Sequence, residues 1–394
     1  MSNRETAITQ TAITQTAITR TAITRRGALK LGAGAAVIGG LGLTGTAQAA
    51  RAAQVPNLSK LTPAQQAGQR VIFSYPGPTP PASLLDAISA GEAGGVIFFG
   101  ENITSLSQIA GVVAQLKEAN DASPVSSPLL LMTDQEGGIV HRLPGAPTMS
   151  ERQIGESPNP GAAASAAGTG AGQNLAGVGM NTNLAPVLDV YRVPGNFDDE
   201  FGRSYSEDPN ICAECGVAML TAQQSLNIAA TAKHFPGLGA ATVAQNTDLG
   251  PVTLDVPLAD LRNIDELPFG SAIAAGVDMV MTSWATYPAL DPNLPSGLSP
   301  AIVQGELRQR LKFRGVTITD ALEAGAIASF GTPAQCSVLA AGAGMDVLLC
   351  SARDVSEGQD SVAALASALQ NHDLDPGQFN IALRRVLALR DSLA

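Results

Sequence analysis

Eight short runs of apolar and β-branched residues recur along the chain, and Ala-rich stretches with helical spacing separate most of them. Each run has the length and composition of a buried strand, bounded by glycine, proline or polar residues. Strands that alternate with helices form parallel sheets, and eight such units predict a single-domain (β/α)8 barrel of the TIM type. The expected strands are 71–73, 95–99, 129–133, 183–187, 231–233, 279–282, 316–319 and 347–350, and helical stretches include 161–179, 209–228, 257–275 and 333–343.

Charge and aromatic content narrow the range of partners. The chain has a formal net charge of −11, and only 4% of its residues are aromatic. An acidic surface repels nucleic-acid phosphates and anionic lipids, and few aromatic rings are available for base stacking. We therefore expect no nucleic-acid binding and no peripheral membrane role. Because no G-x-G-x-x-G motif follows the first expected strand, a dinucleotide-binding fold lacks its fingerprint.

The first 49 residues have the features of an export signal. After four TAIT pentads, Arg25-Arg26 precedes a short apolar run rich in Gly and Ala, which ends at the small-x-small sequence Ala47-Gln48-Ala49. This order is typical of twin-arginine export. A membrane anchor is the alternative, but the run is too short and too rich in glycine to span well. We expect residues 1–49 to be a signal peptide with a disordered leader, residues 50–394 to form the barrel, and the mature protein to be extracytoplasmic.

Four cysteines, Cys212, Cys215, Cys336 and Cys350, leave two structural states open. Export permits disulfides, and four thiols allow three pairings among which the sequence does not choose. Cys212-x-x-Cys215 could suggest a metal or redox site, but no second Cys or His pair lies near it. We expect buried or disulfide-linked structural cysteines, and neither a metal centre nor a cofactor.

Ionisable residues stand at the ends of three expected strands. They are Asp134 in Asp-Gln-Glu-Gly-Gly, Lys233 in Lys-His-Phe-Pro-Gly, and Asp320. The active site of a (β/α)8 barrel lies at the carboxyl ends of its strands. A polar residue in such a place can instead cap a helix, but three unrelated strands with ionisable ends favour an active site.

Five motifs follow one another in a fixed order across nearly all of residues 50–394. They are 134–138 with Arg142, 183–189, 202–205 before Asp208-Pro209, 233–239 and 319–322. This order resembles glycoside hydrolase family 3, and within it the single-domain β-N-acetylglucosaminidase branch. The resemblance implies a barrel enzyme that cleaves O-glycosidic bonds without a cofactor.

The resemblance implies that Asp320 is the nucleophile. A carboxylate in this role attacks the anomeric carbon and forms a glycosyl-enzyme, so the stereochemistry is retained. It must stay ionised, and we expect Arg142, Arg203 and Lys233 to supply the stabilising positive charge. The alternative is that Asp320 is the N-cap of a helix that begins at Ala321.

The resemblance also implies that Asp134 accepts hydrogen bonds from sugar hydroxyls, which gives charge-assisted contacts that fix orientation. Basic side chains around it would donate to other hydroxyls or to an acetamido oxygen. A buried ion-pair network at the barrel mouth is the alternative, and it applies mainly to Glu136 and Asp189. The expected substrate-binding residues beside Asp134 are Arg142, Arg203, Lys233 and His234.

The chain departs from the branch where the acid/base motif is expected. The branch usually carries Asp-(Ser/Thr)-His four residues after the Lys-His motif. This chain has Ala244-Gln245-Asn246 at that spacing and Asn246-Thr247-Asp248 two residues further on, so the histidine is absent in either register. We hypothesise that Asp248 is the acid/base, with a pKa raised by burial or by the nucleophile. The alternative is a solvated loop residue.

A second departure is Ser283-Trp284, where the family often has Ala-His. Trp284 follows an expected strand, so we predict that its ring stacks on a sugar face, with a core tryptophan as the alternative.

The leading interpretation is an exported retaining β-N-acetylhexosaminidase that acts on cell-wall or chitin-derived oligosaccharides. The alternatives are a β-glucosidase or a phosphorylase of the same family, and a carbohydrate-binding protein that has lost turnover.

Overall fold

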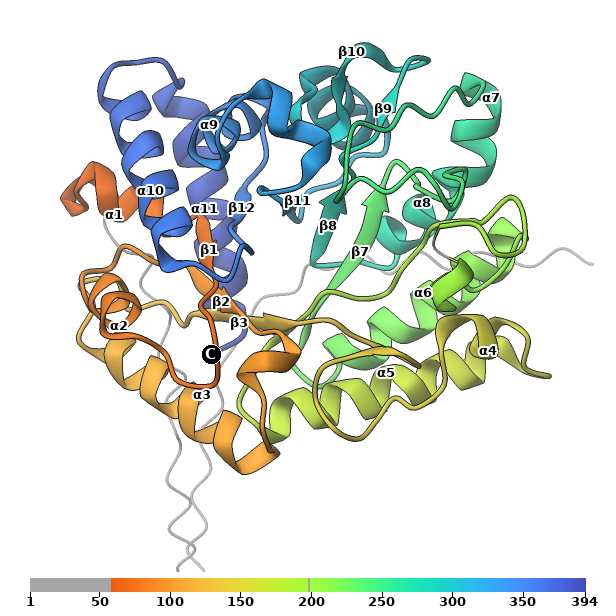
Figure 1. Cartoon of the computed structure of the whole chain (residues 1–394), viewed down its shortest axis with the longest axis horizontal. Helices are drawn as coiled ribbons and strands as arrows, with labels where there is room; N and C mark the ends of the chain where they lie inside the picture. Colours follow the sequence, from red (N-terminus) through yellow and green to blue (C-terminus); the bar gives the residue numbers. More distant parts are fainter. Residues whose placement is uncertain (1–57, 198) are drawn as a thin grey trace, which may run out of the picture. The chain divides into compact units, whose positions relative to one another are not determined.

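The computed structural model of the protein describes residues 58–197 and 199–394. Eight parallel strands close into a barrel, in which each strand pairs with the next barrel strand along the chain and the last pairs with the first (Figure 1). The predicted (β/α)8 fold is therefore confirmed. The barrel strands are β1 (Val71–Phe73), β2 (Gly95–Ile97), β3 (Leu130–Thr133), β6 (Thr182–Asn183), β7 (Ala229–Phe235), β8 (Met279–Thr282), β11 (Val316–Ala321) and β12 (Val347–Leu349).

Helices surround the barrel, and several begin at a residue that the sequence marks as a cap. Asp208 accepts a hydrogen bond from the amide of Asn210 and is followed by proline, which is pre-organised for the first turn. Thr332 caps α9 in the same way, again before a proline. The α-helices are α1 (Pro63–Gly68), α2 (Ala82–Ser89), α3 (Leu106–Asp121), α4 (Glu151–Gly155), α5 (Pro160–Gly177), α6 (Pro209–Gln224), α7 (Leu258–Asp260), α8 (Leu267–Ala274), α9 (Pro333–Ala343), α10 (Val355–Gln370) and α11 (Pro376–Ser392).

Shorter elements complete the described chain. Two antiparallel hairpins stand outside the barrel, β4 (Gln135–Gly137) with β5 (Val140–His141) and β9 (Thr286–Tyr287) with β10 (Asp291–Pro295). The π-helical segments are η4 (Leu261–Asp265) and η6 (Ala301–Arg310). The 3-10 turns are η1 (Leu58–Lys60), η2 (Gly100–Asn102), η3 (Asp199–Phe201), η5 (Ser296–Leu298) and η7 (Gly325–Phe330).

Two expected elements are interrupted in the structure. The strand expected over 183–187 is reduced to β6, and Val187 only bridges to Lys233. Pro186 lacks the amide hydrogen that a continuous ladder needs. The helix expected over 257–275 is divided into α7, η4 and α8, with Pro268 in the first turn of α8.

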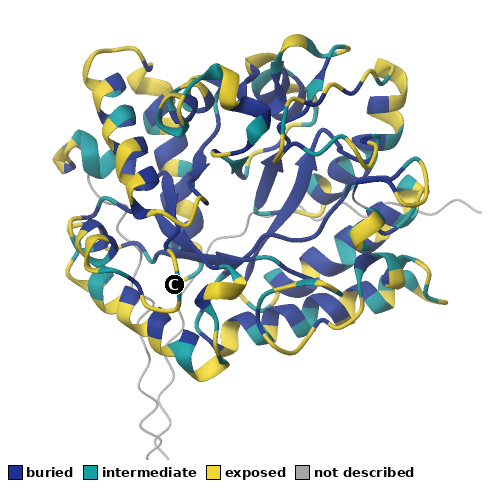
Figure 2. Cartoon of the chain, viewed as in Figure 1, coloured by how far each residue is buried: buried dark blue, intermediate teal, exposed yellow. Residues whose placement is uncertain are grey.

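The strands are buried on both sides (Figure 2). One apolar cluster joins side chains of β1, β2, β3, β8, β11 and β12. Four of its members, Ile97, Leu184, Met281 and Leu349, also line a cavity at the carboxyl ends of the strands. The apolar interior of the barrel therefore forms the floor of this cavity.

The four cysteines are buried and free, so the disulfide-linked alternative does not hold. None of the helices over the described residues has both the length and the hydropathy of a membrane span. The predicted signal peptide, together with the start of the predicted barrel domain at residue 50, lies outside the described residues.

Candidate active site

A cavity of about 480 Å³ opens at the carboxyl ends of the barrel strands. All but one of the predicted site residues line it, although they come from motifs spread over nearly 190 positions of sequence. Barrel closure brings these strand ends together. The predicted residues that line the cavity are Asp134, Arg142, Arg203, Lys233, His234, Asp248 and Asp320.

Asp134 is placed directly after β3 and contacts two cations. Its Oδ1 lies 2.8 Å from Lys233 Nζ, and its Oδ2 lies 3.8 Å from a terminal nitrogen of Arg142. Lys233 is almost fully buried in β7, whereas Asp134 is partly open to the cavity. Asp134 therefore has a fixed orientation and can still accept hydrogen bonds from a ligand.

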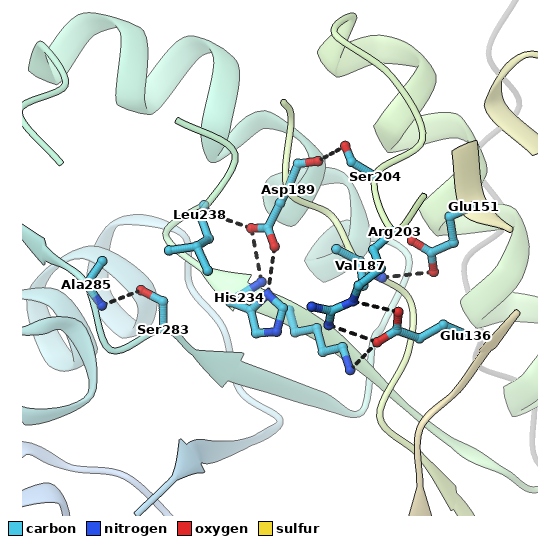
Figure 3. A network of polar contacts seen from close by, with 12 residues as sticks. Glu136, Glu151, Val187, Asp189, Arg203, Ser204, His234, Leu238, Ser283 and Ala285 are labelled. Carbon is cyan, nitrogen blue, oxygen red and sulfur yellow. Dashed lines mark hydrogen bonds and ion pairs between the residues drawn. The ribbon is translucent and has the colours of Figure 1, made fainter. Parts of the chain in front are cut away.

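Glu136 is the centre of a buried charge network (Figure 3). Arg203 donates to both of its oxygens, at 2.9 and 3.0 Å, and Lys233 Nζ lies 2.6 Å from Oε1. Burial alone would raise the pKa of Glu136, but the charges of Arg203 and Lys233 lower it to about 2. Burial also acts on Lys233 and would lower its pKa. The charges of Asp134 and Glu136 outweigh burial, so the pKa of Lys233 is raised above its usual value. The ion-pair interpretation of Glu136 therefore holds, and it fixes two cations at the cavity.

Gly137 allows the hairpin after Glu136 to turn tightly. Its φ of +126° is unfavourable for other residues, and a Cβ there would lie 2.2 Å from the carbonyl oxygen of Met149. This is a structural reason for glycine in the Asp-Gln-Glu-Gly-Gly motif.

His234 is oriented by a fully buried carboxylate. Its Nδ1 lies 2.6 Å from Asp189 Oδ2, while Asp189 Oδ1 accepts hydrogen bonds from the amides of His234 and Leu238 (Figure 3). Burial would lower the pKa of His234, but Asp189 raises it above its usual value, with a smaller contribution from Asp320. Asp189 thus forms a buried ion pair with His234. This agrees with the alternative interpretation of Asp189, a buried ion-pair network at the barrel mouth.

Asp320 lies near the end of β11 and is half-buried at the cavity. No helix begins at Ala321: the chain turns there, and the next regular elements are η7 and α9. The N-cap alternative for Asp320 is therefore wrong. Its carboxylate stands at the edge of a cavity that also holds Lys233, Arg203 and His234.

Asp248 reaches the same cavity from the loop after β7. The loop is attached to the segment that follows Asp320, because Gly325 donates to the carbonyl of Asp248 at 2.9 Å and Ala326 donates to that of Thr247 at 3.0 Å. The Asp248 residue is exposed at the cavity rim, but partial burial of its carboxyl and the nearby charge of Asp320 raise its pKa. Asp248 and Asp320 therefore line the same cavity, and the charge of Asp320 adds to the effect of burial on Asp248.

The prediction that Trp284 stacks on a sugar is wrong. Its side chain is 1% exposed and packs within the core, where its indole nitrogen donates to the carbonyl of Ala321 at 2.7 Å. The ring closely approaches Gly297, at which a Cβ would lie 2.5 Å from the indole. Trp284 therefore supports the backbone next to Asp320 and does not line the cavity.

Two acidic residues next to the predicted site residues, Glu151 and Glu323, were not predicted from the sequence. Glu151 is fully buried, accepts from the amide of Val187, and has a pKa raised well above normal by burial and by Glu136. Glu323 lines the cavity and accepts from the hydroxyl of Ser351 at 2.8 Å. Burial raises the pKa of Glu323, and Asp320 adds a small contribution. Glu323 follows directly after the Thr-Asp-Ala-Leu motif. Its closeness to Asp320 in the sequence is therefore the one feature that could have predicted it as a site residue.

The described residues contain no group of three or more His, Cys, Asp or Glu side chains placed to hold a metal ion. The site instead combines carboxylates with buried cations in a cavity of the size of a small polar ligand. A (β/α)8 barrel with carboxylates at its carboxyl-terminal mouth is the architecture of many hydrolases that act on sugars.

Comparison with known proteins defines the family. The model of the glycosyl hydrolase family 3 N-terminal domain matches residues 72–389. An uncharacterized secreted glycosyl hydrolase of Arthroderma benhamiae is 46% identical over 333 residues, which are 84% of this chain and 94% of the relative. The chain belongs to glycosyl hydrolase family 3 and is a glycoside hydrolase acting on O-glycosyl bonds.

Two solved structures agree with the predicted branch. A glycoside hydrolase family 3 β-N-acetylglucosaminidase from Paenibacillus sp. is 32% identical with a TM-score of 0.80, over 84% of this chain and 63% of that one. The chain thus spans less than two thirds of that enzyme. The β-N-acetylhexosaminidase from Beutenbergia cavernae is 35% identical with a TM-score of 0.76, over 84% of this chain and 98% of that one. The predicted resemblance to this family and branch is confirmed.

Proposed function

We propose that the protein is a retaining β-N-acetylhexosaminidase with Asp320 as nucleophile and Asp248 as acid/base. The observation that carries the proposal is that Asp320 and Asp248 line one cavity, where burial and, after it, the charge of Asp320 raise the pKa of the Asp248 carboxyl. Different protonation states for two neighbouring carboxyl groups are what a retaining glycosidase requires. Similarity to solved enzymes that act on β-N-acetylhexosamines supports the choice of sugar.

In the first step, an oxygen of ionised Asp320 attacks the anomeric carbon while the bond to the leaving oxygen breaks. The proton of Asp248 passes to that oxygen, so the leaving group departs as a neutral alcohol. Asp320 becomes an ester of the sugar. The positive charge of Lys233, Arg203 and His234 favours binding of the electron-rich sugar oxygens around this centre.

In the second step, Asp248 acts as a base. Asp320 is neutral while it is esterified, so its contribution to the raised pKa of Asp248 disappears. The Asp248 carboxylate then accepts a proton from water, and the water oxygen attacks the anomeric carbon and releases Asp320. Two displacements on opposite faces restore the original β configuration.

Asp134 is proposed to bind the sugar hydroxyls, held in position by Lys233 and Arg142. Two carboxylate oxygens can accept from two adjacent hydroxyls, which fixes the ring relative to Asp320. Arg203 is proposed to assist, and Glu136 holds its guanidinium plane through two hydrogen bonds. These contacts orient the sugar, and the specificity for an acetamido group is inferred from the related enzymes.

A panel of nitrophenyl β-glycosides tests the proposed specificity. We expect kcat/KM for the N-acetylglucosaminide to exceed that for the glucoside by about 10-fold or more, because a site that hydrogen-bonds a substituent discriminates against its absence. Rates measured with and without phosphate distinguish hydrolysis from phosphorolysis. A preference for the glucoside would contradict the proposed sugar, and saturable binding of every glycoside without release of nitrophenol would indicate a binding protein.

We further propose that residues 1–49 direct the protein out of the cytoplasm by the twin-arginine route. The paired arginines and the cleavage site support this proposal, as does a relative described as secreted. Replacing both Arg25 and Arg26 with lysine should leave the full-length protein in the cytoplasmic fraction of the cell. Unchanged export of this double variant, detected in the extracytoplasmic fraction, would contradict the assignment.

A further inference from the structure

The cavity is lined by both charged and apolar side chains. Asp134, Lys233 and Asp320 lie among its polar residues, where the reacting sugar is proposed to bind. Three phenylalanines also line it, and they come from the segments after β2 and β6. Hydroxyl recognition does not require an aromatic ring, so a ring that stays accessible at this cavity would make a second kind of contact. These rings are Phe99, Phe197 and Phe201.

Among these three rings, Phe201 has the most accessible face. The guanidinium of Arg353 lies 4.3 Å from the centre of the Phe99 ring and covers it. Phe197 is 8% exposed and belongs to the core. Phe201 is 41% exposed, one of the larger exposures of an apolar side chain in the described part of the chain. A large apolar ring that lines a ligand cavity and remains accessible is a candidate binding surface.

Phe201 is also held in a defined orientation. Its ring meets that of Phe197 edge to face, with centroids 6.5 Å apart and planes at 83°. The surrounding turn is closed by hydrogen bonds from Glu200 to the carbonyl of Asn196 at 2.9 Å and from Gly202 to that of Asp199 at 2.8 Å. A pre-organised ring loses little conformational entropy when a ligand packs on it.

The position of this turn indicates which part of the substrate it meets. Asn196 Nδ2 donates to the carbonyl of Gly239 at 2.7 Å, and the amide of Phe197 donates to that of Ala241 at 3.4 Å. The turn is therefore attached to the loop that continues to Asp248. Because an acid/base stands beside the leaving oxygen, the leaving group emerges on the side of the cavity formed by this loop.

We propose that Phe201 is the platform of a subsite for the leaving group, and that its ligand is a second β-linked pyranose ring. A pyranose in the β configuration presents a face of C–H groups that packs on an aromatic ring, while its hydroxyls stay in water. The inference rests on the proposed function and extends it, because it makes the substrate an oligosaccharide rather than any small glycoside.

The test compares two substrates that share the reacting sugar and differ in the leaving group. One is the disaccharide of two β-1,4-linked N-acetylglucosamines, and the other is N-acetylglucosaminyl β-fluoride, whose leaving group has no ring. In Phe201→Ala, kcat/KM for the disaccharide should fall about 3- to 10-fold, the range expected for one aromatic contact, while the value for the fluoride stays unchanged. Phe201→Tyr, which retains the ring, should keep both values.

Val193→Ala is the matched control. Val193 is 63% exposed in the same chain segment and does not line the cavity, so its replacement should leave both substrates unaffected. Thermal unfolding of each variant verifies that the fold is retained. Equal losses on both substrates, or no loss on the disaccharide, would overturn the subsite. If the parent enzyme hydrolyses the fluoride but not the disaccharide, the proposed function stands and the proposed subsite is wrong. If it hydrolyses neither substrate, both the proposed function and the subsite are overturned.

Discussion

Replacing Asp320 with alanine should lower kcat on every β-glycoside by about 10³-fold or more, because the variant has no oxygen with which to form the covalent intermediate. Binding should change little, since Lys233 contacts Asp134 and Glu136, and Glu136 in turn holds Arg203. None of these contacts includes Asp320. Steady-state kinetics on the nitrophenyl N-acetylglucosaminide measures kcat, and a titration with the product sugar measures binding.

A chemical rescue sharpens this prediction. In Asp320→Ala, azide can occupy the space of the missing carboxylate and attack the anomeric carbon directly, which would give a glycosyl azide of inverted configuration. Asp255→Ala is a suitable control, because Asp255 is exposed and does not line the cavity. Residual activity of Asp320→Ala within about 10-fold of the parent would show that the nucleophile lies elsewhere.

Replacing Asp248 with asparagine should produce a loss that depends on the leaving group. For the disaccharide, whose leaving alkoxide needs a proton, we expect kcat/KM to fall by about 10²- to 10⁴-fold. For a dinitrophenyl glycoside, which leaves without protonation, the first step should be nearly unaffected. Equal losses on the two substrates would remove Asp248 from the role of acid.

The pH dependence follows from the direction of the Asp248 pKa shift. The first step needs protonated Asp248, so kcat/KM for the disaccharide should fall as the pH rises through its pKa. Because burial and Asp320 raise that pKa, the fall in kcat/KM should occur above the pH at which an ordinary aspartate ionises. The asparagine side chain of Asp248→Asn cannot ionise, so this fall should be absent from its pH profile. If the fall persists unchanged in the variant, it is caused by the ionisation of another group.

Gly325 offers a second way to test Asp248 without changing its chemistry. A Cβ on residue 325 would lie 2.6 Å from the backbone of Leu249 and 2.9 Å from the carbonyl oxygen of Asp248. The Gly325→Ala variant must therefore change the contact between the segment after Asp320 and the loop that carries Asp248. It should show the same selectivity as Asp248→Asn, with a larger loss on the disaccharide than on the dinitrophenyl glycoside.

The barrel could be predicted because its signals are local. Each strand is a short apolar run, and the expected bounds of β1 and β8 agree with the structure to the residue. The prediction was less accurate where backbone chemistry interrupts a regular element, as Pro186 does after β6. It also missed the hairpin of β4 and β5, where Gly137 allows an immediate reversal of the chain.

The site was predicted where its residues follow strands, because barrel closure places all strand ends at one mouth. This is why Asp134, Lys233 and Asp320 share a cavity despite their separation in sequence. Trp284 also follows a strand, but a strand end does not determine whether a side chain points toward the mouth or into the core. Phe201 ends the short 3-10 turn η3, and no periodicity in the sequence indicates where such a turn folds.

The most direct test of the central claim is to trap the covalent intermediate. A 5-fluoro derivative of the N-acetylglucosaminide with an activated leaving group slows both steps, and the activated leaving group allows the glycosyl-enzyme to accumulate. Peptide mapping by mass spectrometry should then locate one sugar on Asp320, and the label should be absent from Asp320→Ala. A label on any other residue, or turnover to a product of inverted configuration with no label, would contradict the account.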